Sequence, residues 1–329
     1  MKIYPKHLVP LAAIVCLLSM SLTIAVRSIQ ANAGSVPEST MTNGYSSGEF
    51  SDGGRLRTYE IYTPTSYNPS HPMPLVLVFH GDDGSGRSIA DVTRFNELAE
   101  KAGFIAVYPN GVDSRWNLRG SHHSALTNID DVSFVSALLD RIEQIRSIDT
   151  QRIYATGFSR GAILVQDLAC ELPNRIAAFA SVAGSLPYRV QPQCQPNTPI
   201  SMLMINGTND LAVHYQGDVK GQHGALIPIP DAIDFWRSHD QCTSSDQVKE
   251  LPDPAPSDRF KVKVSRYSGC RDGSEIMLMA VVDGGHMWPG GASQDASINQ
   301  FNAQLGFKAT ETIWNFFQRH SLSVHTLQH

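Results

Sequence analysis

The chain has 329 residues, of which 42% are hydrophobic, and it carries a formal net charge of −5 at pH 7. This size and hydrophobic content are typical of one large globular domain or two small ones. A net negative chain with a pI near 6.2 argues against nucleic acid as a partner, and no sequence feature indicates an obligate protein partner.

The first 33 residues have the three parts of a secretory signal peptide. Lys2 and Lys6 make a basic start, residues 8–26 carry no charge, and a small-x-small cleavage site ends at Ala33. We therefore expect residues 1–33 to be removed and the protein to be secreted or periplasmic. Because the uncharged stretch is 19 residues long, an uncleaved membrane anchor over residues 8–26 is the alternative.

The remainder of the chain predicts a sheet whose strands alternate with helices. Residues 34–51 are polar and rich in Ser and Gly, which predicts a flexible leader. The predicted strands cover residues 55–64, 73–81, 104–109, 152–156, 178–184, 199–207, 260–269 and 275–284. The predicted helices cover residues 96–103, 130–146, 161–171, 229–240 and 310–319.

This alternation predicts an α/β fold with a mostly parallel central sheet and helices on both faces. No linker divides the chain, so one domain over residues 52–320 fits better than two, followed by a short C-terminal tail over residues 321–329. No inserted segment is long enough to form a large lid.

Four cysteines remain after the signal segment, and an even number in an exported protein predicts two disulfides. Four cysteines allow three pairings. We favour Cys170–Cys194 together with Cys242–Cys270, because these pairings keep each closed loop short.

The pentapeptide Gly-Phe-Ser-Arg-Gly at residues 157–161 lies between a predicted strand and a predicted helix. A serine on such a tight turn needs neighbours almost without side chains at positions −2 and +2, which Gly157 and Gly161 provide. The turn projects the hydroxyl above the sheet edge, so Ser159 is the candidate nucleophile.

A serine nucleophile needs a histidine base and an acid, in the chain order Ser, Asp or Glu, His for this kind of sheet. Asp210 and His286 each follow the end of a predicted strand, at the edge where Ser159 lies. The rival histidines are His80 and His214. The rival acids Asp231 and Asp234 fall on a predicted helix, where a charged first turn and a solvated face are the simpler explanations.

The reaction also needs donors for the oxyanion. The backbone N–H of Arg160, directly after the nucleophile, is the first candidate. The loop after the strand at residues 73–81 supplies the second, with Asp82 favoured over Asp83. Two carboxylates are unexpected beside a developing negative charge, so we expect these side chains to point away.

Six segments together resemble the secreted poly(3-hydroxybutyrate) depolymerase and feruloyl esterase-like family of α/β-hydrolases, over roughly residues 50–318. These segments are HGDDGSG, RWNLRG, NIDDVSFVSALLD, RIYATGFSRGA, GTNDLAVHYQG and GGHMWPGG. The resemblance implies a Ser-Asp-His esterase whose triad is Ser159, Asp210 and His286. Many relatives carry a cysteine cluster after the Trp-Asn pair, which this chain lacks.

The resemblance also implies the substrate classes. We expect a polyhydroxybutyrate-type polyester or its oligomers, with feruloyl or acetyl esters of plant polysaccharides as the alternative and a secreted peptidase, a lipase or thioesterase, or a non-catalytic binding protein as weaker candidates. Trp116, Asn117 and Trp288 are predicted to line the pocket, since aromatic walls suit either kind of ester. The mechanism requires no cofactor, and we expect no metal, because no close cysteine pair exists and the adjacent His122 and His123 point apart.

Overall fold

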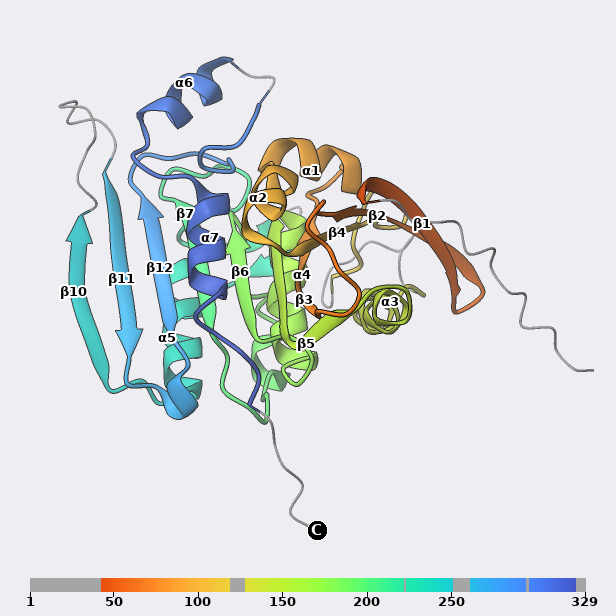
Figure 1. Cartoon of the computed structure of the whole chain (residues 1–329). Helices are drawn as coiled ribbons and strands as arrows, with labels where there is room; N and C mark the ends of the chain where they lie inside the picture. The colour runs from red at the N-terminus through yellow and green to blue at the C-terminus, as the bar shows by residue number, and fades with distance from the viewer. Residues whose placement is uncertain (1–42, 119–127, 222, 251–260, 294–295, 324–329) are drawn as a thin grey trace, which may run out of the picture. The chain divides into compact units, whose positions relative to one another are not determined.

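In the part of the chain that this computed structural model describes, ten strands form one large sheet (Figure 1). The structure describes residues 43–118, 128–221, 223–250, 261–293 and 296–323. The sheet order is β1-β2-β4-β3-β5-β6-β7-β12-β11-β10, and β8 and β9 form a separate hairpin. The bounds are β1 Gly44–Asp52, β2 Arg55–Thr63, β3 Met73–Phe79, β4 Ile105–Pro109, β5 Ile148–Phe158, β6 Ala178–Val182, β7 Met202–Gly207, β8 Asp218–Gly221, β9 Gly224–Leu226, β10 Ser244–Glu250, β11 Val262–Ser268 and β12 Ile276–Val281.

The centre of this sheet is parallel and its two edges are antiparallel. Strands β4, β3, β5, β6, β7 and β12 pair in parallel, whereas β1 and β2 at one edge and β11 and β10 at the other pair antiparallel. The central strands are continuous apolar runs because both of their faces are covered. The predicted α/β fold is therefore confirmed.

Helices cover both faces of the sheet, and the sheet lies between two hydrophobic clusters. The helices are α1 Gly86–Thr93, α2 Phe95–Ala102, α3 Asp131–Ile145, α4 Arg160–Glu171, α5 Ile229–His239, α6 Ala296–Gln304 and α7 Ala309–Phe317. Side chains of α3, α4 and α5 enter one cluster, and side chains of α1, α2 and α7 enter the other. Parallel strands between two helical layers bring the carboxyl ends of the strands to one edge of the sheet, and the loops that carry Ser159, Asp210 and His286 start from that edge.

The flexible leader predicted over residues 34–51 is wrong where the structure describes it. Residues Gly44–Asp52 form β1, which pairs with β2 along its full length. Phe50 anchors this strand by stacking on Phe134 of α3 at 5.7 Å between ring centroids. The predictions for residues 1–33, including the signal and the possible anchor, and for residues 324–329 of the tail lie outside the described residues.

Two disulfides join the cysteines as the sequence favours. Cys170 pairs with Cys194, and Cys242 pairs with Cys270. Among the residues that the structure describes, no helix is both long and apolar enough to cross a membrane.

Candidate active site

Ser159 lies at a strained turn between β5 and α4. Its backbone has φ 56° and ψ −122°, a conformation that L residues rarely adopt and that costs of order 1–3 kcal/mol. The Ser159 N–H donates to the carbonyl oxygen of Val182 in β6 at 3.0 Å, which ties the turn to the neighbouring strand. The strain and this anchor hold the serine where the strand ends and the helix begins.

The two glycines around Ser159 are required by close backbone approaches. A Cβ atom on Gly157 would lie 2.4 Å from the carbonyl oxygen of Gly161, and a Cβ on Gly161 would lie 2.4 Å from the carbonyl oxygen of Phe79. Both distances are far below van der Waals contact. The predicted clash across the turn is therefore found for Gly157, whereas Gly161 is required by the approach of α4 to the end of β3.

Asp210 and His286 come together from two different loops. His286 Nδ1 is 2.8 Å from Asp210 Oδ2, and the other oxygen of this carboxylate accepts the N–H groups of Ala212 at 2.8 Å and Val213 at 2.9 Å. Because the carboxylate can only accept from Nδ1–H, this contact leaves Nε2 of the neutral imidazole as its basic nitrogen. Ser159 and His286 line one cavity of about 340 Å³, so the structure brings the three predicted residues together.

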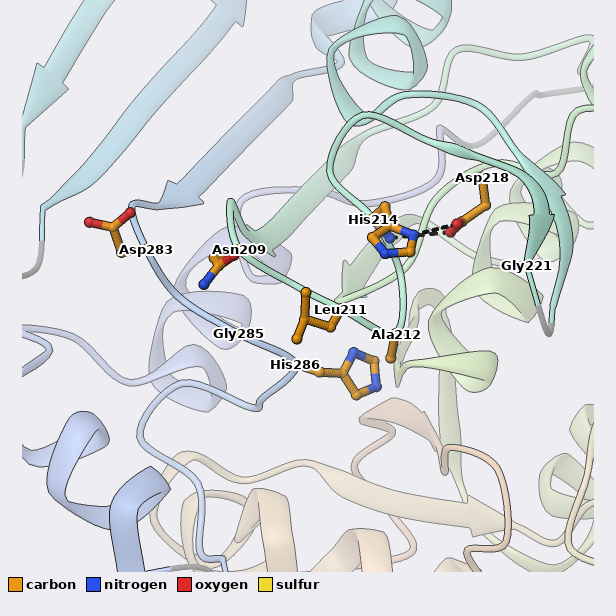
Figure 2. A pocket seen from close by; sticks show the side chains of 9 residues that line it. All are labelled: Asn209, Leu211, Ala212, His214, Asp218, Gly221, Asp283, Gly285 and His286. Carbon is orange, nitrogen blue, oxygen red and sulfur yellow. Dashed lines mark hydrogen bonds and ion pairs between the residues drawn. The ribbon is translucent and has the colours of Figure 1, made fainter.

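The rival residues have other partners. His214 pairs with Asp218 (Figure 2), and Asp234 pairs with Arg237 at 2.6 Å on α5. Asp231 lies in the first turn of α5. His80 is buried, and its Nε2 accepts the Gly111 N–H at 2.9 Å.

The predicted oxyanion donors lie on segments that pack directly against each other. Arg160 is the first residue of α4, and a Cβ on Gly81, next to Asp82, would lie 3.2 Å from the Cβ of Ser159. Within the described part of the chain, neither the Arg160 nor the Asp82 backbone N–H donates to a protein acceptor. Both groups are thus available for a ligand beside the serine.

The expectation that the two acids point away is half wrong. Asp83 is exposed and pairs with Arg115 at 3.0 Å. The Asp82 carboxylate instead turns inward, and its Oδ1 lies 3.4 Å from Nε of Arg160.

Two further cavities flank His286. One, of about 500 Å³, is mainly apolar and is lined by Val92, Phe158, Met287, Trp288 and Ile298 among others. The other, of about 710 Å³, is more polar; Figure 2 shows its lining, with Leu211 near His286 and the His214–Asp218 pair farther along the same wall. The imidazole therefore stands between an apolar space and a polar one.

Of the three predicted pocket residues, one lines a cavity and one is buried in the core. Trp288 lines the apolar cavity, although its Nε1–H is bound to Thr310 Oγ1 at 3.0 Å. Trp116 is 0% exposed and donates its indole N–H to the carbonyl oxygen of His80 at 2.8 Å, so the prediction of a substrate wall is wrong for this residue.

Asn117 makes two hydrogen bonds to residues at and just before the start of α3. Its backbone N–H donates to Asp131 Oδ2 at 2.6 Å, and its side-chain amide donates to the carbonyl oxygen of Ile129. Residues 119–127, which follow it, lie outside the described residues, so the pocket role of Asn117 stays a prediction.

The sequence reasoning missed two contributors to the site. Phe158 packs its ring against His286 at 4.8 Å between centroids and lines the apolar cavity with it; its place directly before the serine was the available signal. The β8–β9 hairpin contributes Asp218 and Gly221 to the polar cavity, and no periodicity marked these short strands.

No cluster of three or more potential metal ligands occurs among the described side chains. His122 and His123 lie outside the described residues.

Comparisons with known proteins find esterases. Residues 57–188 match the family model described as "Esterase PHB depolymerase". The chain is 31% identical over 165 residues to the bifunctional acetylxylan esterase/xylanase XynS20E of Neocallimastix patriciarum, covering 50% of this chain and 23% of that protein. It is 26% identical over 277 residues to feruloyl esterase D of Neurospora crassa, covering 81% of this chain and 83% of that protein.

The fold is similar to a solved acetyl xylan esterase from Aspergillus awamori. The TM-score is 0.52 at 15% identity, with 78% of this chain and 98% of the other covered. The chain is therefore similar to the poly(3-hydroxybutyrate) depolymerase and feruloyl esterase-like family of α/β-hydrolases, and the relatives that it matches are named as esterases.

Proposed function

We propose that the protein hydrolyses carboxylic esters through a covalent acyl-enzyme on Ser159. The observation that carries the proposal is the His286–Asp210 contact at 2.8 Å beside a serine on a strained strand-to-helix turn. His286 Nε2 takes the proton of the Ser159 hydroxyl, and Asp210 orients the imidazole and stabilises its charged form. Water, activated by the same histidine, then releases the acid and restores the serine.

The tetrahedral intermediate in this mechanism carries a negative oxygen. We assign its stabilisation to the backbone N–H groups of Arg160 and Asp82, which have no protein acceptor in the described structure. Preorganised donors of this kind are worth about 10²–10³ in rate each.

The cavities on the two sides of His286 favour an ester between an apolar acid and a hydroxyl-rich alcohol. The apolar cavity with Phe158 and Trp288 suits an aromatic or short aliphatic acyl group. The polar cavity with Asn209, His214 and Asp218 offers hydrogen-bonding groups to a saccharide alcohol. Relatives named as feruloyl and acetylxylan esterases support this assignment.

A polyhydroxybutyrate oligomer is the second candidate substrate. It is favoured by the family model, described as "Esterase PHB depolymerase", and by an apolar cavity whose volume of about 500 Å³ is large enough for a hydroxybutyrate unit. Export is part of the proposal for either substrate, since two disulfides are typical of an oxidising compartment.

The test is hydrolysis of p-nitrophenyl acetate by the purified protein, with Ser159→Ala as control. We expect turnover in the wild type and a loss of at least about 10⁴-fold in the variant. Methyl ferulate, acetylated xylan and hydroxybutyrate trimer, compared by kcat/KM, then rank the substrates. Absence of turnover in folded wild-type protein, or equal turnover in Ser159→Ala, contradicts the proposal.

A further inference from the structure

The side chains of the two proposed oxyanion donors contact each other. The Arg160 guanidinium, which is 0% exposed, lies with Nε 3.4 Å from Asp82 Oδ1 and Nη1 3.5 Å from Oδ2. Asp82 follows β3, and Arg160 begins α4. An ion pair thus joins the two segments whose backbone N–H groups are the proposed oxyanion donors.

This ion pair belongs to a closed ring of contacts. Arg160 Nε also donates to the carbonyl oxygen of Trp116 at 2.7 Å, and the Trp116 indole N–H donates to the carbonyl oxygen of His80 at 2.8 Å. His80 is two residues before Asp82, so the ring returns to the loop from which it started. Every member therefore limits the movement of the loop relative to α4.

The His80 side chain fixes the same loop from a second direction. Its Nε2 accepts the Gly111 N–H at 2.9 Å, so Nδ1 carries the hydrogen and donates to the carbonyl oxygen of Gly81 at 2.6 Å. Burial lowers the pKa of His80, which keeps this neutral form at pH 7.

The ion pair also accounts for the Asp82 carboxylate beside the proposed oxyanion site. An unpaired carboxylate at residue 82 would repel the developing negative charge, and low local dielectric would strengthen that repulsion. His223 Nδ1 lies 3.4 Å from Asp82 Oδ2, but burial lowers the pKa of His223, so the imidazole is neutral at pH 7. Arg115 is more distant, with Nε 4.0 Å from Oδ1 and its Nη2 on Asp83. Arg160 is therefore the permanently charged group closest to this carboxylate.

We propose that the Arg160 side chain is a positioning residue for the oxyanion site: it holds the Asp82 loop against α4 and neutralises the Asp82 carboxylate beside the reacting oxygen. The inference rests on the proposed ester hydrolysis and adds a side-chain role for a residue that the sequence selected only for its backbone N–H. It also gives buried Trp116 a function, as the link between Arg160 and His80.

The experiment compares Arg160→Met, Asp82→Asn and the double variant with the wild type. All three keep the backbone N–H groups. Activity is kcat and KM for p-nitrophenyl acetate, expressed per active site by titration with a fluorophosphonate. Arg175→Met is the matched control, because it removes an arginine from ion pairs with Asp140 and Glu143 outside the site.

We expect Arg160→Met to lower kcat about 100-fold with KM changed less than about twofold, because the donors act on the transition state. The double variant should recover about tenfold of this loss, since no unpaired carboxylate remains. A trifluoromethyl ketone, which forms a tetrahedral adduct with serine, should lose affinity in parallel with kcat. Arg175→Met should keep the wild-type kcat.

Three results overturn the inference. Arg160→Met with kcat per active site within about threefold of the wild type removes the positioning role. A double variant no faster than Arg160→Met removes the role in charge neutralisation. A change in thermal stability alone, with kcat and ketone affinity intact, leaves Arg160 merely structural.

A different result is expected if the proposed ester hydrolysis itself is wrong. The wild type would then hydrolyse no ester while still reacting with the fluorophosphonate. In that event the labelling rate of Ser159, compared between the wild type and Arg160→Met, tests the same oxyanion geometry, and an equal rate overturns the inference.

Discussion

Replacing Gly161 by alanine tests whether the close approach of α4 to the end of β3 controls catalysis. The added Cβ would lie 2.4 Å from the carbonyl oxygen of Phe79 and 2.5 Å from that of His80. Ordinary contact begins near 3.4 Å, so the two backbones must separate by about 1 Å. One of them carries the Arg160 N–H and the other leads to Asp82.

The structure gives the expected size of two separate effects. A misplacement of about 1 Å costs about 10²-fold in rate, equivalent to about 2.7 kcal/mol of transition-state stabilisation. Overpacking of this kind lowers the free energy of unfolding by about 1–3 kcal/mol. We therefore expect Gly161→Ala to fold with reduced stability and to lose about 100-fold in kcat.

The assay is p-nitrophenyl acetate hydrolysis at saturation, per titrated active site, together with urea unfolding. Ala169→Gly is the control: Ala169 is buried near the far end of the same helix, so the variant should lose about 1 kcal/mol of stability and keep its kcat. A folded Gly161→Ala protein with kcat within threefold of the wild type would refute the reasoning.

Three further predictions address the acid, a buried histidine and a disulfide. Asp210→Asn should lower kcat about 10⁴-fold and leave the circular dichroism spectrum unchanged. The amide oxygen can still accept a hydrogen bond from the Ala212 N–H, but the amide NH₂ group cannot accept one from His286 Nδ1–H. A loss below tenfold would contradict the triad. Burial lowers the pKa of His320 in the folded protein to about 4, whereas its pKa in the unfolded chain is near 6.5. As the pH falls from 6.5 to 4, the unfolded state therefore binds this proton before the folded state does. The free energy of unfolding should decrease by about 3 kcal/mol over this range. In urea unfolding at both pH values His320→Gln should lack this part of the loss, and an identical pH profile would be the contrary result. Replacing Cys242 and Cys270 together by serine should lower the free energy of unfolding by about 3 kcal/mol, and a loss below 1 kcal/mol would contradict the loop-entropy argument.

The parallel centre of the sheet was predictable because its strands are buried on both faces. Residues such as Val76 and Ile205 stand in continuous apolar runs, a local signal that survives without tertiary information. The candidate triad was predictable for a related reason: a parallel sheet sends the loops after its strands to one edge, so strand order alone brings Ser159, Asp210 and His286 near each other.

The edge strand β1 was not predictable from the same signal. Its sequence GYSSGEFSD is polar and lacks a continuous apolar run, yet it pairs with β2 along its full length. Phe50 contacts Tyr59 of β2 and Phe134 of α3, and the Arg87 guanidinium lies over the ring of Tyr45. The pairing itself is local, because Gly53 and Gly54, both at positive φ, form a two-residue turn between Asp52 and Arg55.

The role of Trp116 was not predictable either. Its place in a loop after a strand is compatible with a substrate wall or with a buried support. Two hydrogen bonds make Trp116 a buried support: its indole N–H donates to the carbonyl oxygen of His80, and Arg160 donates to the carbonyl oxygen of Trp116. Both partners are distant in sequence. The cavities are likewise assembled from loops that follow different strands.

The two disulfides lie at the end of the domain away from the candidate active site. Cys170 ends the helix that Ser159 begins, and Cys270 precedes the strand whose far end leads to His286. The loops at the catalytic edge are held by non-covalent contacts, while the opposite end is cross-linked. Local unfolding should therefore begin in the loops at the catalytic edge of the sheet, and amide hydrogen exchange there should be faster than around the two disulfides. Reduction of the disulfides would increase the mobility of the end opposite the candidate active site. The mobility of the loops at the catalytic edge should stay as it is in the oxidised protein.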